Sequence, residues 1–336
     1  YTAVCTMPNL SPAPDGLETL KAETDIIEKD AVINVYPYGT ITKGEKGEEL
    51  SDMERLAPFV CAFSDDGRGV QSEEMMRRAM LKAKQLGKVI AAHCEDDSLL
   101  FGGVMHEGEA AKRLGVKGIS SESEYKMIER DLRLAKETGV KYHVCHISTA
   151  ESVEIIRRAK KEGVNVTCET APHYLILTDE DVINDGRFKM NPPLRSERDR
   201  QALIGGVLDG TIDMISTDHA PHTAEEKSKG LIGSPFGVVG IETAFAVMYS
   251  AFVKTKLIDE KRLYELLGGN ARKRFSLPIR KDDFCICETE TGYRINPENF
   301  LSKGKSTPLA GLEVYGNCVL TVCGGKIVWQ KISTLN

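Results

Sequence analysis

Short apolar runs alternate with amphipathic, charge-bearing segments from the first residues of the chain to about Arg274. The apolar runs have the length of β-strands, and the segments between them show helical spacing. This alternation predicts repeated βα units around a parallel sheet. The strand-like runs are residues 2–7, 32–36, 59–63, 89–92, 141–146, 165–169 and 213–216, and the clearest helical segments are 72–86, 121–137, 150–162 and 197–208.

The predicted strands number seven, one fewer than a (β/α)8 TIM barrel requires. Because an open barrel would leave two strand edges unpaired, we expect the chain, which begins at Tyr1, to be a fragment without its first strand. Short β runs follow the last helical segment. We therefore predict a barrel over residues 1–275 and a small C-terminal β appendage over 276–336, which would be part of a composite β domain.

Charge and cysteine usage exclude several classes of protein. The 44 basic and 50 acidic residues are interspersed and form no basic stripe, so nucleic acid is not an expected partner. No apolar run reaches the roughly 18 residues that span a bilayer. Several of the nine cysteines lie in apolar runs, and none forms a CxxC pair, which predicts free, packed thiols and a cytoplasmic location.

Polar residues recur where the predicted strands end, and in a barrel these ends converge on the catalytic face. They lie in the stretches SDDG (64–67), HCED (93–96), HVCH (143–146), ETAPH (169–173) and TDH (217–219). A lone His at a strand end is usually structural. Within HVCH, an offset of three points the two rings to opposite faces of a strand, so we expect His146 to face the site and His143 to pack outside.

Imidazole and carboxylate groups together are the ligands of hydrolytic zinc. Two metal ions would polarise a scissile carbonyl and lower the pKa of the attacking water, and an Asp at the last strand could carry its proton to the departing nitrogen. The alternative is a barrel whose polar strand ends have no catalytic role. The chain contains no G-x-S-x-G elbow, Walker motif or dinucleotide fingerprint that would favour another chemistry.

Several motifs resemble class I dihydroorotases of the amidohydrolase superfamily, and the resemblance runs through essentially the whole chain. The longest is DGTIDMISTDHAPHTAEEK (209–227). The others are MPN (7–9), FSDDG (63–67), AAHCED (91–96), YHVCHIST (142–149), TAPHYL (170–175), FKMNPPLR (188–195), SPFGVVGIETAF (234–245) and FLSKGKSTPLAG (300–311).

The resemblance implies a site with two zinc ions, Zn2+, at the C-terminal face of an amidohydrolase-type TIM barrel. Asp66 would bridge the ions, His93 and His146 would be further ligands, and Asp218 would bind the other zinc and act as general acid and base. The implied substrate contacts are Asn9, Asn191, His222 and the backbone of Phe236 and Gly237. His219 and Pro221 would shape the turn between Asp218 and His222, and the loop 222–236 would move over the site.

The implied reaction is the reversible cyclisation of N-carbamoyl-L-aspartate to dihydroorotate in pyrimidine biosynthesis. The family's first strand carries His-x-His-x-Arg, which supplies two zinc ligands and an Arg for the substrate carboxylate. This chain contains no H-x-H, so we expect the chain as given to be inactive. The stretch FSLPIRKDDFCICE (275–288) also departs from the family's Gly-rich lead into its β appendage.

Two alternatives stay open at this point. Hydantoinases, dihydropyrimidinases and allantoinases are related enzymes, but they typically carry a carboxylated Lys where Asp66 stands. The second alternative is a non-catalytic dihydroorotase-like protein that serves as a scaffold for aspartate transcarbamoylase. Such proteins lose metal ligands, whereas this chain keeps those that can be checked. The sequence does not decide whether the protein is a homodimer or associates with aspartate transcarbamoylase.

Overall fold

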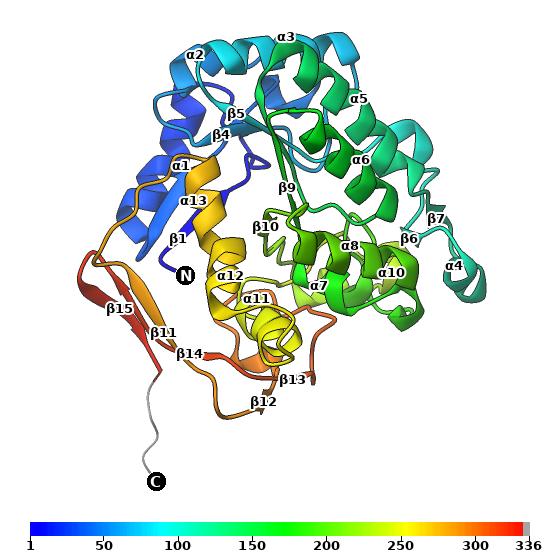
Figure 1. Ribbon diagram of the computed structural model, residues 1–336, viewed down its shortest axis with the longest axis vertical. Coiled ribbons are helices and arrows are strands. Elements are labelled where there is room, and N and C mark those ends of the chain that lie inside the picture. The colour runs from blue at the N-terminus through cyan, green and yellow to red at the C-terminus, as the bar shows by residue number, and fades with distance from the viewer. Residues whose placement is uncertain (332–336) are drawn as a thin grey trace.

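The computed structural model describes residues 1–331, and its centre is a curved parallel sheet (Figure 1). Six strands pair in the order β10-β9-β8-β5-β4-β3, and β1 pairs with β2 in parallel. Because β2 and β3 are separated only by Tyr38, they continue one strand across both sheets. The bounds are β1 (Ala3–Thr6), β2 (Asn34–Pro37), β3 (Gly39–Thr40), β4 (Ala62–Ser64), β5 (Val89–Ala92), β8 (Lys141–Val144), β9 (Val166–Thr170) and β10 (Met214–Ile215).

Every one of the seven predicted strands is present, and the parallel α/β architecture is confirmed. The register is regular, with Ile90 opposite Tyr142 and Tyr142 opposite Val166. Within residues 1–331, β1 pairs only with β2 and β10 pairs only with β9. The carboxyl ends of these parallel strands therefore meet at one end of the sheet.

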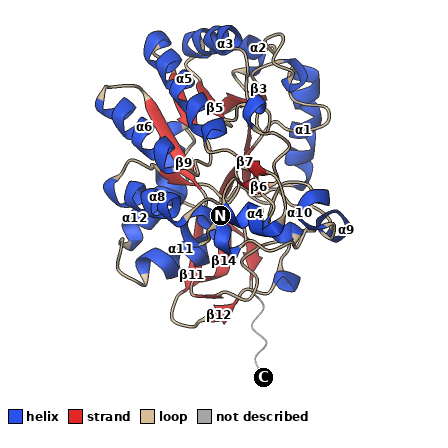
Figure 2. Ribbon diagram, turned by 90° about the vertical axis from the view of Figure 1, so that its right-hand side faces the viewer, coloured by secondary structure: helices blue, strands red, loops and turns tan. Residues whose placement is uncertain are grey.

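Helices cover the outer side of the sheet (Figure 2). Five helices are long, and all but α1 agree with the predicted helical segments to within one or two residues. They are α1 (Leu17–Asp30), α3 (Glu73–Gln85), α5 (Glu122–Thr138), α6 (Ala150–Lys161) and α8 (Glu197–Asp209). Shorter helices are α2 (Met53–Leu56), α4 (Glu109–Leu114), α7 (Pro172–Ile176), α9 (Ala224–Lys227), α10 (Gly230–Gly233), α11 (Ala244–Met248), α12 (Glu260–Tyr264) and α13 (Asn270–Arg274). Wider π-helical turns continue α11 over Tyr249–Val253 and join α12 to α13 over Glu265–Gly269.

Helix α3 begins as its sequence predicts, because the Ser72 hydroxyl accepts a hydrogen bond from the Met75 amide at 3.3 Å. Replacing Ser72 by Ala should lower the free energy of unfolding by about 1 kcal/mol, as loss of an N-cap side chain does. Chemical denaturation would measure the change. Ser121 precedes α5 without making a side-chain cap, so Ser121→Ala is the matched control and should leave stability nearly unchanged.

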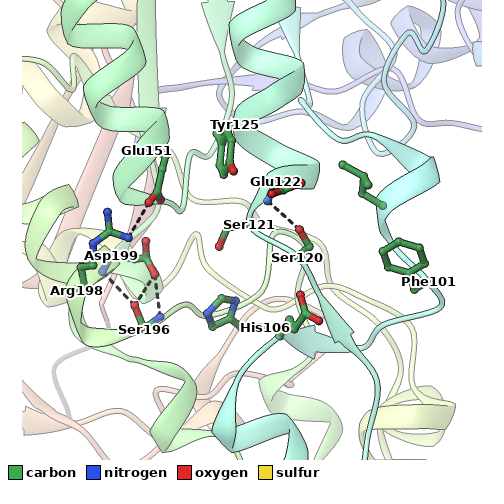
Figure 3. A pocket seen from close by; sticks show the side chains of 12 residues that line it. Phe101, His106, Ser120, Ser121, Glu122, Tyr125, Glu151, Ser196, Arg198 and Asp199 are labelled. Atoms are coloured by element: carbon green, nitrogen blue, oxygen red, sulfur yellow. Dashed lines mark hydrogen bonds and ion pairs between the residues drawn. The ribbon is translucent and has the colours of Figure 1, made fainter.

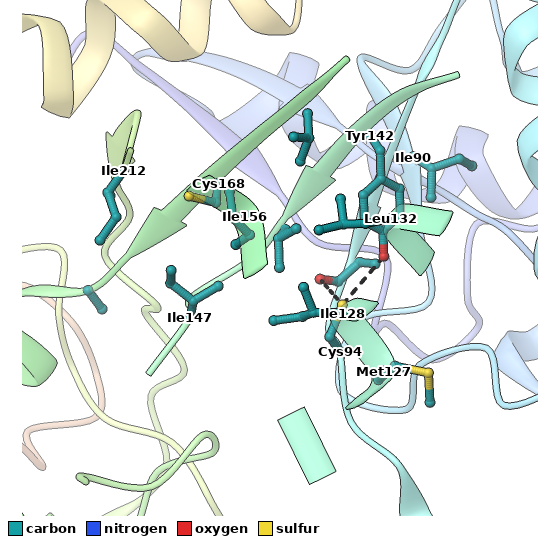
Figure 4. Close-up of a cluster of buried hydrophobic side chains, with 14 of the residues drawn as sticks. Ile90, Cys94, Met127, Ile128, Leu132, Tyr142, Ile147, Ile156, Cys168 and Ile212 are labelled. Carbon is teal, nitrogen blue, oxygen red and sulfur yellow. Dashed lines mark hydrogen bonds between the residues drawn. The ribbon is translucent and has the colours of Figure 1, made fainter. Parts of the chain in front are cut away.

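Hydrophobic side chains of β4, β5 and β10 alternate between two cores. Tyr142 and Val144 of β8 belong to the larger core between sheet and helices. Figure 4 shows Tyr142 beside Leu132 of α5. The smaller core fills the concave interior of the sheet, and its members include Ala91 of β5, Cys145 and Phe275. Odd-numbered positions of β8 therefore face the interior of the barrel.

The last part of the described chain forms small antiparallel sheets beside the barrel. Strands β11 (Phe284–Glu288), β14 (Asn317–Cys323) and β15 (Lys326–Gln330) make one sheet, and β12 (Tyr293–Arg294) pairs with β13 (Glu313–Val314). The predicted β runs after Arg274 are thus present, while the domain boundary at residue 275 stays a prediction. Strands β6 (Met105–His106) and β7 (Gly118–Ile119) form a separate pair, and 3-10 turns lie at Lys43–Glu45, Asp97–Leu99, Asp179–Asp181, Gly186–Phe188 and Pro297–Asn299.

Among residues 1–331, no helix combines the length and the apolar character needed to cross a bilayer. All nine cysteines lie in this part of the chain and are free thiols. The expectation that they are packed is wrong for Cys5 and Cys285, which are exposed.

Candidate active site

Asp66, His93 and His146 come together at the carboxyl ends of β4, β5 and β8. One donor atom from each lies within 4.8 Å of the other two. His93 Nδ1 is 3.0 Å from His146 Nε2, and the same His146 nitrogen is 3.7 Å from Asp66 Oδ1. The three candidate ligands, which are far apart in the sequence, therefore form one cluster.

Buried hydrogen bonds fix the backbone on either side of this cluster. Asp65 Oδ1 accepts from the amides of Ile41 and Thr42 at 2.7 and 3.0 Å, which ties the end of β4 to the segment after β3. Glu124 of α5 accepts from the amides of Ser148 and Thr149 at 2.9 and 3.0 Å. These bonds hold the residues next to Asp66 and His146, so the positions of both side chains are constrained.

Two of the predicted site residues have strained backbones. His146 has φ 34° and Asp218 has φ 45°, both in the left-handed region that side chains larger than glycine rarely occupy. Such strain costs free energy and is kept where the surrounding structure imposes it, typically at functional sites.

The expectation that His143 packs outside the barrel is wrong. His143 is buried in the interior, where its ring meets Phe275 edge-on and its Nε2 lies 3.2 Å from Glu169 Oε2. The two rings would point to opposite faces only if the strand continued as far as His146. Strand β8 ends at Val144, and the positive φ of His146 turns that ring inward as well.

Asp218 follows β10 and faces the same end of the barrel. Its Oδ2 is 3.7 Å from His173 Nε2, at the start of α7. Burial raises the pKa of the Asp218 carboxyl, and the charge of His146 opposes this rise. His173 follows the predicted strand ends too, but sequence reasoning gave it no role; burial lowers its pKa to about 3, so the ring is neutral.

The cluster holds opposite charges close together. Burial alone would raise the pKa of Asp66, but its contact with His146 and the charge of His93 outweigh burial and lower it. Burial likewise opposes protonation of His146, yet Asp66 and Asp218 raise the pKa of its ring to about 9. The carboxylates thus create a strongly negative potential that favours a positive charge at this position.

The two candidate substrate amides contact carboxylates of the site. Asn9 donates from Nδ2 to Asp66 Oδ2 at 3.1 Å, and Asn191 donates to both oxygens of Glu95 at 2.8 and 2.9 Å. Glu95 also lies 3.4 Å from His93 Nε2. Sequence reasoning did not single out Glu95, although its position two residues after His93 was a usable signal.

The remaining candidates lie together on the loop after β10. His222 Nε2 is 2.8 Å from the Phe236 carbonyl oxygen, so the ring donates to it. Gly237 has φ +133°, and a Cβ at that position would lie 2.5 Å from the Ala220 carbonyl oxygen, so only glycine fits. His219 accepts from the Gly240 amide at 3.4 Å, which agrees with the predicted turn-shaping role.

His106 lies apart from the cluster, in a pocket of about 570 Å³ at the starts of α5, α6 and α8 (Figure 3). Its Nδ1 is 3.2 Å from Arg195 Nη1, and burial together with that guanidinium lowers the pKa of the ring to about 4. None of the predicted site residues lines the pocket.

The donor set fits a divalent metal ion. Asp66, His93 and His146 offer one carboxylate oxygen and two imidazole nitrogens, which several divalent ions accept. Asp66 Oδ1 and His146 Nδ1 are also buried without a hydrogen-bond partner among the described residues. Asp218 is not part of this group.

Several solved structures share the fold of this chain. An L-hydantoinase from Arthrobacter aurescens aligns with a TM-score of 0.84 and 24% identity, over 100% of this chain and 78% of that one. A D-hydantoinase from a Bacillus species aligns with a TM-score of 0.81 and 21% identity, over 98% and 78%. At such identities the likeness shows the barrel fold alone. At its carboxyl end this barrel carries a cluster of His and carboxylate groups, which is a donor set of metal-dependent hydrolases.

The sequence comparisons define the family more narrowly. A family model described as Dihydro-orotase-like matches residues 1–152. A dihydroorotase of Fusobacterium nucleatum is 53% identical over 343 residues, covering 100% of this chain and 81% of the relative. A dihydroorotase of Geobacillus kaustophilus is 50% identical over 339 residues, covering 98% and 79%. The chain belongs to the dihydroorotase family.

Proposed function

We propose that the protein catalyses the reversible cyclisation of N-carbamoyl-L-aspartate to dihydroorotate, a step of pyrimidine biosynthesis. The observation that carries this proposal is the cluster of Asp66, His93 and His146 at the carboxyl ends of neighbouring strands, in a chain about half identical to dihydroorotases. The alternative that the protein is a hydantoinase is supported by the fold only. The sequence identity to the solved hydantoinases is too low to assign a substrate.

We propose zinc as the metal, with two ions in each active site. Asp66, His93 and His146 would hold one ion, and Asp66 and Asp218 would contribute to the other. Metal ions held by such ligands polarise a carbonyl oxygen and lower the pKa of water. Zinc is favoured because it combines imidazole and carboxylate ligands at hydrolytic sites.

The side chains of the protein would then have separate tasks. Asp218 would accept the proton of the attacking water and deliver it to the ring nitrogen that departs, which is general base and then general acid catalysis. Asn9, Asn191, His222 and the backbone at Phe236 and Gly237 would bind and orient the substrate. In this arrangement Glu95 orients both His93 and Asn191, because it contacts each of them.

Turnover of dihydroorotate by the full-length gene product with zinc would test the proposal, with hydantoin and dihydrouracil assayed in parallel. We expect hydrolysis of dihydroorotate and little turnover of the other rings. Preference for hydantoin or dihydrouracil would favour the related enzymes. If the protein binds no metal and hydrolyses none of the three substrates, the non-catalytic scaffold would be favoured.

We also expect the protein to be cytoplasmic. A homodimeric state and association with aspartate transcarbamoylase stay predictions. Sedimentation of the full-length protein, alone and mixed with the transcarbamoylase of the same organism, would test both.

A further inference from the structure

Lys227 is a buried cation that the proposed chemistry does not use. It ends helix α9 on the loop between His222 and Phe236, and only 5% of its surface is exposed. Burial lowers the pKa of the ammonium to about 8, and so does the neighbouring Lys189, while Asp185 acts in the opposite direction. A buried charge is costly unless it is well hydrogen-bonded, so its contacts show what this Lys stabilises.

The Lys227 ammonium donates three hydrogen bonds, all to backbone carbonyl oxygens. The acceptors are Lys189 at 3.0 Å, Pro235 at 2.9 Å and Gly237 at 2.7 Å. An ammonium group has three donors, so its hydrogen-bonding capacity is fully used. The bonds join two segments that are distant in the sequence, one around residue 189 and one around residue 236.

Both segments carry candidate substrate contacts. Asn191 lies two residues after Lys189, and Pro235 and Gly237 flank Phe236. The Phe236 carbonyl accepts from His222, so three successive carbonyls are held by side chains of the same loop. The Gly237 amide also donates to the Lys189 carbonyl at 3.0 Å, which makes that oxygen a shared acceptor.

The packing around Gly186 requires the backbone at Lys227 to lie close to the segment that contains Gly186 and Lys189. A Cβ at Gly186 would lie 2.2 Å from the Lys227 carbonyl oxygen, so the backbones approach as closely as glycine allows. Lys189 itself places its ammonium 4.7 Å above the Phe236 ring and donates to the Ile232 carbonyl at 3.2 Å. The loop is therefore attached at several points, with Lys227 at the centre.

We propose that Lys227 is a positioning residue that fixes the Phe236–Gly237 backbone, His222 and the Asn191 segment in their substrate-binding arrangement. This proposal rests on the proposed function for its kinetic consequence, but its structural consequence is independent of the substrate. Lys227 touches neither the candidate metal ligands nor Asp218. Its loss should therefore weaken substrate binding more than the proton transfer.

Replacing Lys227 by Met removes the three donors and keeps a side chain of similar length. We expect kcat/KM for dihydroorotate to fall by up to about 100-fold, mainly through KM, because misplaced binding groups can cost that much. Lys227→Gln keeps one donor group, so its kcat/KM should lie between that of the unmodified protein and that of Lys227→Met. Lys229→Met removes the same charge from an exposed position on the same loop and should leave kcat and KM unchanged.

Hydrogen exchange provides the second readout. In Lys227→Met the amides of Ala220 and Gly237, which are bonded in the native loop, should exchange faster, while those of the barrel strands keep their protection. Unchanged exchange at these amides would overturn the proposal, as would a loss confined to kcat. If the full-length protein without the substitution turns over no dihydroorotate, the proposed function fails, and hydrogen exchange still decides the role of Lys227.

Discussion

Asp218→Asn should lower the turnover of dihydroorotate by about 10²- to 10⁴-fold, the range that a general acid or base contributes. The amide keeps the size of the side chain but can no longer accept the proton from water. Because Asp218 lies outside the group formed by Asp66, His93 and His146, the ion held by those three should remain bound. Steady-state kinetics with parallel metal analysis would measure both effects.

The interpretation of Asp218→Asn depends on the fold staying intact. The backbone of Asp218 is already strained at φ 45°, and Asn tolerates the left-handed region about as well as Asp. We therefore expect the thermal stability of the variant to stay close to that of the unmodified protein. Unchanged turnover in a correctly folded variant would exclude Asp218 as the proton carrier and would require another group to do that work.

The place of the cluster could be predicted from the sequence by a single rule, whereas the choice of Asp66, His93 and His146 as its ligands came from the family resemblance. Parallel strands end at one edge, so Asp66, His93 and His146, each one or two residues beyond a strand, had to converge. The same reasoning found the strands, since runs such as 89–92 are short, apolar and separated by helical segments. Nothing in this step required knowledge of distant contacts.

The orientation of His143 could not be predicted in the same way. The prediction assumed regular strand geometry from His143 to His146, but the strand stops at Val144 and the backbone then takes a positive φ. That turn is imposed by tertiary contacts, including those of Glu124 with the residues after His146. Side chains therefore alternate between the two faces only as far as the strand keeps its hydrogen bonds to the neighbouring strands.

Contacts between distant segments were equally inaccessible. Glu95 meets Asn191 and Lys227 meets Lys189 because loops after different strands fold over the same end of the barrel. Sequence spacing carries no signal for such pairs. Composition even argues against the contact of Lys227 with Lys189. A Lys in a loop rich in Lys, Glu and Gly is normally solvated, whereas Lys227 is buried.

Asp66→Ala should remove bound metal from the full-length protein and abolish turnover of dihydroorotate. Asp66 supplies the carboxylate of the cluster and would serve both ions of the proposed site. Changes to groups that merely orient metal ligands cost about 10- to 100-fold in metal affinity, so loss of a shared ligand should cost at least that much. Metal content after dialysis against a weak chelator would measure the loss.

A matched control separates ligand loss from a general change in charge. Asp97 is an exposed carboxylate close to Glu95, and Asp97→Asn should keep both the metal content and the activity. Because the pKa of Asp66 is lowered by His146 and His93, its removal also leaves those rings without their anionic neighbour. Full metal content and turnover in Asp66→Ala would contradict the bridging role, whereas loss of one ion with residual turnover would assign Asp66 to a single ion.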